Sequence, residues 1–185
     1  MGAGASVSYD EVGRTRALLL TRIALYGYTM TQVIPTREWS GPSYTYTIGL
    51  PQHIGHPELA VCGLSPKASI RVITSVVGLL EETPEAEGRV VGAFANDVPC
   101  WIAPIPDRMV DSYLGLAEWW RRDHHDGGTA AVKQIIVCDP TCRFPWEQGC
   151  QPGYGRGQSL LLPQITVREP RTTVTDQQGG ASATG

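Results

Sequence analysis

The sequence predicts a single α+β domain: a mostly antiparallel sheet, or one curled toward a barrel, with about three helices packed on it. Segments with helical periodicity and segments with the alternation of a strand follow one another without the strict order that parallel sheets require. With 185 residues, of which 42% are apolar, the chain is long enough to bury a substantial core.

We expect residues 1–167 to form this domain and residues 168–185 to form a disordered tail. The tail runs through Pro, Thr, Gln, Gly and Ala with almost no bulky apolar residue. Such a segment cannot bury enough apolar surface to offset the entropy of ordering its backbone.

Three segments carry the signals of helices. Residues 9–26 repeat apolar side chains at helical spacing and stop before Gly27, a residue typical of the position after a helix. A Ser-Pro pair at 65–66 begins the second helix with a capping hydroxyl and a proline at the first helical position. A Pro-Asp pair at 106–107 begins the third helix, whose apolar positions lie within residues 109–120.

Short segments rich in β-branched and aromatic residues predict the strands. They cover residues 28–34, 44–50, 59–63, 89–95, 98–105 and 132–138. Asn96-Asp97 between two of them predicts a hairpin turn. Residues 139–157 are long and rich in glycine and proline, so we expect this segment to be either functional or loosely ordered.

The charge balance and the apolar runs exclude several classes of protein. The 15 Lys+Arg and 18 Asp+Glu leave a net charge of −3, with no basic block, so nucleic acid is not an expected partner. No apolar run reaches the roughly 18 residues of a membrane span, so no membrane is expected either. The five cysteines are an odd number and no export signal precedes them, which favours reduced thiols in the cytoplasm.

The densest polar cluster lies between two predicted strands, at residues 53–58. It contains His53, His56 and Glu58, and such groups serve either as metal ligands or as an acid/base pair. Pro57 excludes the helical H-E-x-x-H zinc pattern. The structural alternative is a turn in which one histidine hydrogen-bonds to the backbone and fixes the loop.

Two further clusters favour structural roles. Residues 123–126 read Asp-His-His-Asp and are typical of a solvated helix end, where cationic histidines favour the negative end of the helix dipole. Cys138, Cys142 and Cys150 follow the pattern C-x3-C-x7-C, which matches neither zinc ribbons nor iron–sulfur sites. We expect buried or incidental thiols there, with a Cys138–Cys142 disulfide on oxidation as the alternative.

Residues 143–149 place two aromatic rings around Pro145. Arg143 could meet an anion and Trp146 could stack on a ligand ring, as in a lid over a pocket. A loop pinned to the core by its aromatics is the alternative. At Trp119-Trp120 we expect one ring in the core and the other partly exposed, which suits a partner surface.

Three segments together resemble a known family. They are YTYTIGL at 44–50, GHPEL at 55–59 and RFPWE at 143–147. In this order the chain resembles the bacterial family called domain of unknown function 4262, over about residues 27–162. The resemblance implies a shared fold and no particular reaction. At a looser level the TIGL strand is similar to a strand of split-barrel flavin reductases, in which Thr and Ser face the flavin phosphate.

The hypothesis favoured by these residues is a small acid/base enzyme for a small polar or peptide substrate. In it, His56 is the acid or base and Glu58 orients it. Tyr44, Tyr46, Thr47, His53, Arg143 and Trp146 would bind the substrate, because functional loops gather at strand ends. The alternatives are a binding module for a flavin-like ligand, and an interaction or immunity-type protein with a protein partner. The sequence identifies neither a cofactor nor a metal.

Overall fold

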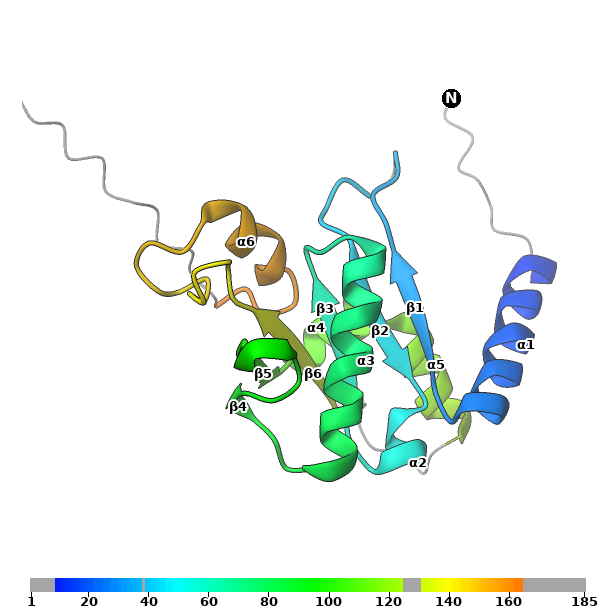
Figure 1. Ribbon diagram of the computed structural model, residues 1–185. Coiled ribbons are helices and arrows are strands. Elements are labelled where there is room, and N and C mark those ends of the chain that lie inside the picture. Colours follow the sequence, from blue (N-terminus) through cyan, green and yellow to red (C-terminus); the bar gives the residue numbers. More distant parts are fainter. Residues whose placement is uncertain (1–8, 38, 125–130, 165–185) are drawn as a thin grey trace, which may run out of the picture.

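The computed structural model describes residues 9–37, 39–124 and 131–164 (Figure 1). The helices are α1 (Tyr9–Tyr26), α2 (Leu50–Ile54), α3 (Pro66–Glu82), α4 (Asp107–Tyr113), α5 (Gly115–His124) and α6 (Pro152–Arg156), with short 3-10 turns η1 (Ala95–Asp97) and η2 (Gly157–Ser159). The strands are β1 (Thr29–Val33), β2 (Tyr44–Ile48), β3 (Glu58–Cys62), β4 (Gly88–Val90), β5 (Cys100–Pro104) and β6 (Val132–Val137).

The six strands form one sheet in the order β1-β2-β3-β6-β5-β4. β3 and β6 run parallel in its centre, and every other neighbouring pair is antiparallel. Among the described strands, β1 and β4 lie at opposite edges and do not pair with each other. The predicted α+β fold with a mostly antiparallel sheet is therefore confirmed, and the sheet is open and does not close into a barrel.

The two faces of the sheet bury different side chains, because successive residues of a strand point to opposite sides. Leu59 and Val61 of β3 pack with the buried face of α3, which consists of Ile73, Val76, Val77 and Leu80. Ala60 and Cys62 pack on the other face with Leu19, Ile23, Val110, Leu114, Ala117 and Trp120. Figure 1 shows α3 in front of the sheet and α4 and α5 behind it. The sheet is thus covered on both sides.

Two of the predicted helices form as expected. α1 spans the predicted residues 9–26, and Gly27 follows it with φ +80°. α3 begins after Ser65, whose hydroxyl accepts a hydrogen bond from the Ala68 amide at 3.4 Å, with Pro66 at the first position.

The third predicted helix is divided into α4 and α5. Leu114 lies between them with φ −116° and ψ 39°, which is outside the helical region. Both halves still cover the sheet, because Val110, Leu114, Ala117 and Trp120 are all buried. The helical periodicity therefore predicted the buried face correctly but not the break.

Other differences arise where glycines turn the chain. The predicted strand at 89–95 ends at Val90, since Gly92 adopts φ +92°, while Asn96 and Asp97 form the turn before β5 with φ 59° and 53°. The predicted tail, residues 168–185, lies outside the described residues. No described helix combines the length and the hydropathy that crossing a bilayer requires.

Candidate functional site

The corner that joins β2 to β3 carries the histidine cluster. Gly49 follows β2 with φ +99° and precedes the five-residue helix α2, and Gly55 ends that helix with φ +73°. Positive φ is readily adopted only by glycine, so these two positions set where the chain leaves and re-enters the sheet. His56 and Pro57 then lead directly into β3.

Glu58, the first residue of β3, is tied into this corner. It is 4% exposed, and its Oε1 accepts a hydrogen bond from the Gly49 amide at 2.6 Å. Its Oε2 accepts one from the Thr47 hydroxyl at 2.5 Å and one from the Leu50 amide at 3.3 Å. The carboxyl group thereby holds the end of β2 and the first turn of α2 against β3.

Burial and hydrogen bonding act in opposite directions on this carboxyl group. Burial raises the pKa of Glu58 from 4.5 to about 7, although the hydrogen bonds from Thr47, Gly49 and Leu50 lower it. Thr47 is itself fixed, because its hydroxyl oxygen accepts the Leu59 amide at 2.8 Å. Glu58 is therefore a rigid group that gains and loses its proton near neutral pH.

His56 is buried beside this corner, with 2% of its surface exposed. Its Nδ1 lies 2.7 Å from the carbonyl oxygen of Pro57. Its Nε2 is buried and has no hydrogen-bond partner among the described residues. Burial lowers the pKa of His56 below 6.5, so the neutral ring is favoured at neutral pH.

Charged residues of neighbouring elements act on the same ring. Lys133 of β6 lowers the pKa of His56. The Pro57 carbonyl, Glu85 and Glu87 raise it, but the lowering effect of burial is the largest. Lys133 Nζ pairs with Glu87 Oε2 at 2.9 Å. This charged group therefore lies close to His56 at the start of β6.

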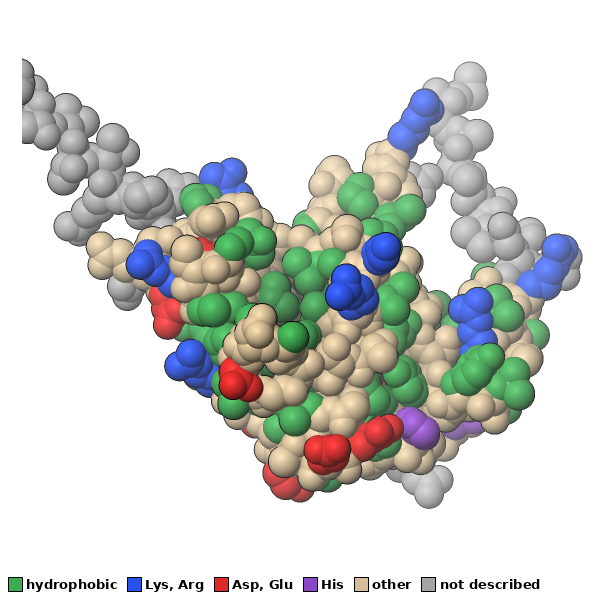
Figure 2. Space-filling view, viewed as in Figure 1, with side chains coloured by type: hydrophobic (Ala, Val, Ile, Leu, Met, Phe, Trp, Pro, Cys, Tyr) green, Lys and Arg blue, Asp and Glu red, His purple; other side chains and the backbone are tan. Residues whose placement is uncertain are grey.

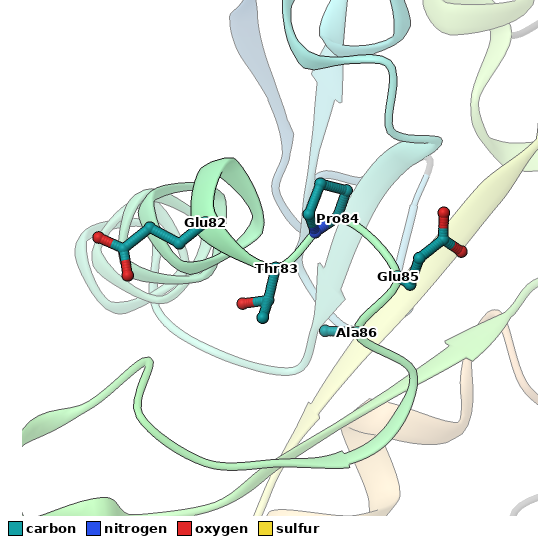
Figure 3. A pocket seen from close by; sticks show the side chains of 5 residues that line it. All are labelled: Glu82, Thr83, Pro84, Glu85 and Ala86. Carbon is teal, nitrogen blue, oxygen red and sulfur yellow. The ribbon is translucent and has the colours of Figure 1, made fainter.

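A hollow of about 440 Å³ opens at the loop between α3 and β4. It is lined by Glu82, Thr83, Pro84, Glu85 and Ala86 (Figure 3). Figure 3 shows Glu82 and Glu85 pointing to opposite sides of this loop. Glu85 lines the hollow, and its charge is one of the smaller influences that raise the pKa of His56.

His56 and Glu58 do not form the direct pair that their spacing suggested. Among the described residues, no hydrogen bond or ion pair joins them: the Nδ1 of His56 faces Pro57, and the oxygens of Glu58 are used by the β2–α2 turn. Glu58 can influence His56 only by holding the backbone around it. It is a positioning residue in this geometry.

The other residues expected near His56 on β2 and α2 pack elsewhere. Tyr44 donates its hydroxyl hydrogen bond to the Tyr113 carbonyl at 3.0 Å. Tyr46 is 3% exposed in the core beside α5, and burial raises its pKa well above the usual range. His53 is exposed, with its ring 5.6 Å from that of Tyr28. Of the predicted binding residues, Thr47 is the one that donates a hydrogen bond to Glu58.

Arg143 and Trp146 lie toward the other end of β6. The ring of Trp146 stacks on Phe144 at 5.1 Å and meets Trp101 edge-on at 5.3 Å. Trp101 pairs with Ile136, whereas Glu58 pairs with Val132; four residues of strand separate them by about 13 Å. Trp146 is thus part of an aromatic cluster on the sheet and does not close over His56.

The adjacent tryptophans divide as expected. Trp120 is 8% exposed and its Nε1 donates to Gln52 Oε1 at 3.2 Å. Trp119 is partly exposed, and the guanidinium of Arg16 lies 4.6 Å from its ring centroid. Trp119 therefore belongs to the contact between α1 and α5.

No group of three or more His, Cys, Asp or Glu side chains with metal-binding geometry occurs in the part of the chain that the structure describes. The cluster at 123–126 is only partly covered, since His125 and Asp126 lie outside the described residues. His124 stacks on Trp120 with a centroid distance of 3.7 Å.

Two residues that the sequence does not single out organise the loop after β6. Asp139 accepts hydrogen bonds from the Thr141 amide and hydroxyl and from the amides of Arg143 and Gln151, at 2.7–3.0 Å. Burial raises the pKa of Asp139, but these hydrogen bonds have the larger combined effect and lower it from 3.8 to about 2. An aspartate followed by proline at a strand end is a turn signal that could have indicated this role.

Gln158 is the second of these residues. Its Oε1 accepts the Val137 amide at 2.8 Å, and its Nε2 donates to the carbonyls of Val137 and Tyr154 at 3.1 and 2.6 Å. The side chain thus pairs with the end of β6 as a neighbouring strand would. No local pattern in the sequence signals this contact.

Comparison with known proteins agrees with the resemblance seen in the sequence. The model of the family described as Domain of unknown function (DUF4262) matches residues 22–151. This range includes the β2 strand, the corner with His56 and Glu58, and the segment around Trp146. No curated protein and no solved structure matches the chain. Because the match covers more than half of its 185 residues, the chain belongs to the DUF4262 family.

Proposed function

We propose that this protein is a small acid/base enzyme for a small polar or peptide substrate, with Nε2 of His56 as the atom that accepts and returns the proton. The observation that carries the proposal is the state of this atom, which is buried and has no hydrogen-bond partner among the described residues. An unpaired buried polar atom is costly, so its retention in a folded protein calls for an explanation, and a catalytic role is one such explanation.

The other ring nitrogen determines the tautomer. A carbonyl oxygen can only accept, so the Nδ1 of His56 carries the hydrogen that it donates to Pro57. Nε2 is then left with its lone pair, which is the form a general base requires. Because burial lowers the pKa of the ring below 6.5, His56 is in this neutral form at neutral pH.

The hollow at residues 82–86 is the substrate site in this proposal. Glu85 supports the assignment, because it lines the hollow and its charge acts on His56. Glu58 contributes by holding the corner that carries the ring, through its hydrogen bonds to Gly49 and Leu50. We assign the activity to the bacterial cytoplasm, whose reducing conditions agree with the five free cysteines.

A panel of chromogenic esters and amides of amino acids tests the proposal, with release of nitrophenolate or nitroaniline as the readout. We expect turnover by the parent chain and a loss of roughly 100-fold or more in His56→Gln, the usual contribution of a general base. His124→Gln, which replaces an exposed histidine of α5, serves as the matched control and should keep the parent rate. Equal rates in His56→Gln and the parent, or binding without turnover, would contradict the acid/base assignment.

A second candidate function, an interaction protein, is supported by the exposed face of α1. Leu18, Leu25 and Tyr26 are 51%, 68% and 69% exposed, and Figure 2 shows hydrophobic side chains beside basic ones at the end of the molecule where α1 lies. Contiguous exposed apolar surface is typical of partner-binding sites. If the protein is an interaction protein, Leu25→Ser abolishes partner binding and His56→Gln leaves it intact. If it is an acid/base enzyme, His56→Gln abolishes turnover and Leu25→Ser leaves it intact.

A further inference from the structure

The chain reverses direction immediately after β6, and two cysteines lie at the base of that turn. The Cys142 amide donates to the Asp139 carbonyl at 2.8 Å, and the Asp139 amide donates to the Arg143 carbonyl at 2.9 Å. Cys142 adopts φ 58°, a left-handed conformation that costs free energy for a residue with a side chain. The hydrogen bonds accepted by Asp139 hold this conformation in place.

This turn brings two thiol groups together. The backbone hydrogen bonds between Asp139 and Arg143 and between Cys142 and Asp139 close the chain on itself directly after Cys138, and Cys142 is near enough to Cys138 to raise the pKa of its thiol. Their exposure differs: Cys142 is exposed, whereas Cys138 is 6% exposed in a cluster with Ile136, Phe144 and Leu162. The thiol of Cys142 is therefore open to solvent reagents, whereas that of Cys138 is largely shielded from them.

We propose that Cys138 and Cys142 are a redox modification site, in which a hydroperoxide oxidises the pair to an intramolecular disulfide. This inference is independent of the proposed acid/base function, because the pair lies at the end of β6 opposite to the start of the strand near His56. Disulfides that form and break in the cytosol are typically catalytic or redox-sensing.

The two steps are balanced as follows. The exposed thiolate of Cys142 attacks one oxygen of the hydroperoxide, which forms a sulfenic acid and releases hydroxide or an alkoxide. The sulfur of Cys138 then attacks the sulfur of Cys142 and displaces its hydroxyl group, which leaves as water with the proton of Cys138. Overall, two thiols lose two electrons and two protons, and the hydroperoxide is reduced to water and an alcohol, or to two waters.

The second step depends on ionisation of a buried thiol. Burial, together with the neighbouring Cys142, raises the pKa of Cys138 to about 11. Disulfide formation should therefore accelerate as the pH rises toward this value. The sulfenic acid on Cys142 should accumulate at lower pH, where the Cys138 thiol stays protonated.

The experiment treats the full chain with hydrogen peroxide and then alkylates the remaining thiols for peptide mapping by mass spectrometry. We expect a peptide in which Cys138 and Cys142 are linked, a mass loss of two hydrogens, and reversal by a dithiol reductant. Cys138→Ser should instead hold a sulfenic acid on Cys142 that a 1,3-dione traps. Cys150→Ser, which removes a buried thiol from the same loop, is the matched control and should form the link like the parent.

Three results would overturn the proposal. One is oxidation of Cys142 to sulfinic acid in the parent without any link to Cys138. Another is covalent dimerisation through Cys142 that proceeds equally in the parent and in Cys138→Ser. The third is a linked peptide that contains Cys100 or Cys150 in place of Cys138. Because Cys142 is exposed, Cys142→Ser should fold normally by circular dichroism and should lose the link.

Discussion

Two buried titratable residues, Glu58 and His56, define the candidate site. Burial disfavours the charged form of each, so the pKa of Glu58 is raised and that of His56 is lowered. Their effects on stability therefore have opposite pH dependence. The stability from Glu58 is full below pH 4.5 and is lost as the pH rises through about 7. The stability from the neutral ring of His56 is present above pH 6.5 and is lost as the pH falls through its lowered pKa.

Glu58→Gln should remove the contribution of this carboxyl group to the pH dependence. The substituted amide keeps the shape of the protonated side chain, and its oxygen can still accept the Gly49 amide. We expect the difference in unfolding free energy between parent and variant to change by about 3 kcal/mol between pH 4.5 and about 7, with the parent losing stability as the pH rises. Urea unfolding at several pH values measures this difference.

The exposed Glu82 provides the control for that series. Glu82→Gln removes the same charge from the end of α3 without touching the β2–α2 turn. It should leave the pH dependence as it is in the parent. If Glu58→Gln and Glu82→Gln show the same pH dependence of the unfolding free energy, the carboxyl group of Glu58 ionises in the folded chain as it does in water. The description of Glu58 as a buried group with a raised pKa is then wrong.

Among the elements, the η2 turn packs against the end of β3. The backbones of Gly157 in η2 and of Gly63, which follows β3, lie in close contact. A Cβ on Gly157 would lie 2.6 Å from the Cα of Gly63, and one on Gly63 would lie 2.7 Å from the carbonyl carbon of Gly157. Both contacts are with backbone, which cannot move aside as a side chain can. This approach keeps Gln158 against β6, where it holds Val137.

Gly157→Ala should therefore separate η2 from β3. We expect a loss of about 1–3 kcal/mol in unfolding free energy, the usual cost of overpacking. Gly153→Ala, in α6, is the matched control: nothing lies within 4 Å of a Cβ there, and alanine favours a helix over glycine. Chemical denaturation of both variants checks the pair, and an equal effect of the two substitutions would contradict the close approach.

The elements and their connections were predictable from the sequence to different degrees. Helices such as α1 and α3 depend on local periodicity and on caps such as Ser65-Pro66, so the bounds of α1 and the start of α3 agree with the prediction. The α2 helix was not predicted, because it depends on Gly49 in a left-handed conformation and on hydrogen bonds that the Gly49 and Leu50 amides donate to Glu58, a residue of another strand. The sequence suggested that Trp146 lies over His56. It could not show their separation, because the pairing of β3, β5 and β6 is long-range and leaves no local pattern.

At the scale of the whole molecule, order should decrease from the centre of the sheet outward. β3 and β6 are paired on both sides and contribute fully buried residues such as Leu59 and Ile135. α1 instead contributes Leu19 and Ile23 to the core and leaves most of its surface exposed. Figure 1 shows α1 at the margin of the molecule, beyond the edge strand β1.

Amide hydrogen exchange followed by mass spectrometry should reproduce this order. We predict the slowest exchange in β3 and β6, because their amides open only when the sheet unfolds, and much faster exchange in α1. Protection of α1 equal to that of β6 would indicate that a partner or a second copy covers its exposed leucines.

A long-range ¹H–¹⁵N correlation spectrum of the histidine rings, recorded across a pH titration, shows whether His56 is a neutral base. His56→Gln assigns the signals of His56. We expect a ring protonated on Nδ1 and unprotonated on Nε2 at neutral pH, with a pKa below 6.5. A ring protonated on Nε2, or a pKa at or above 6.5, would contradict His56 as a neutral base.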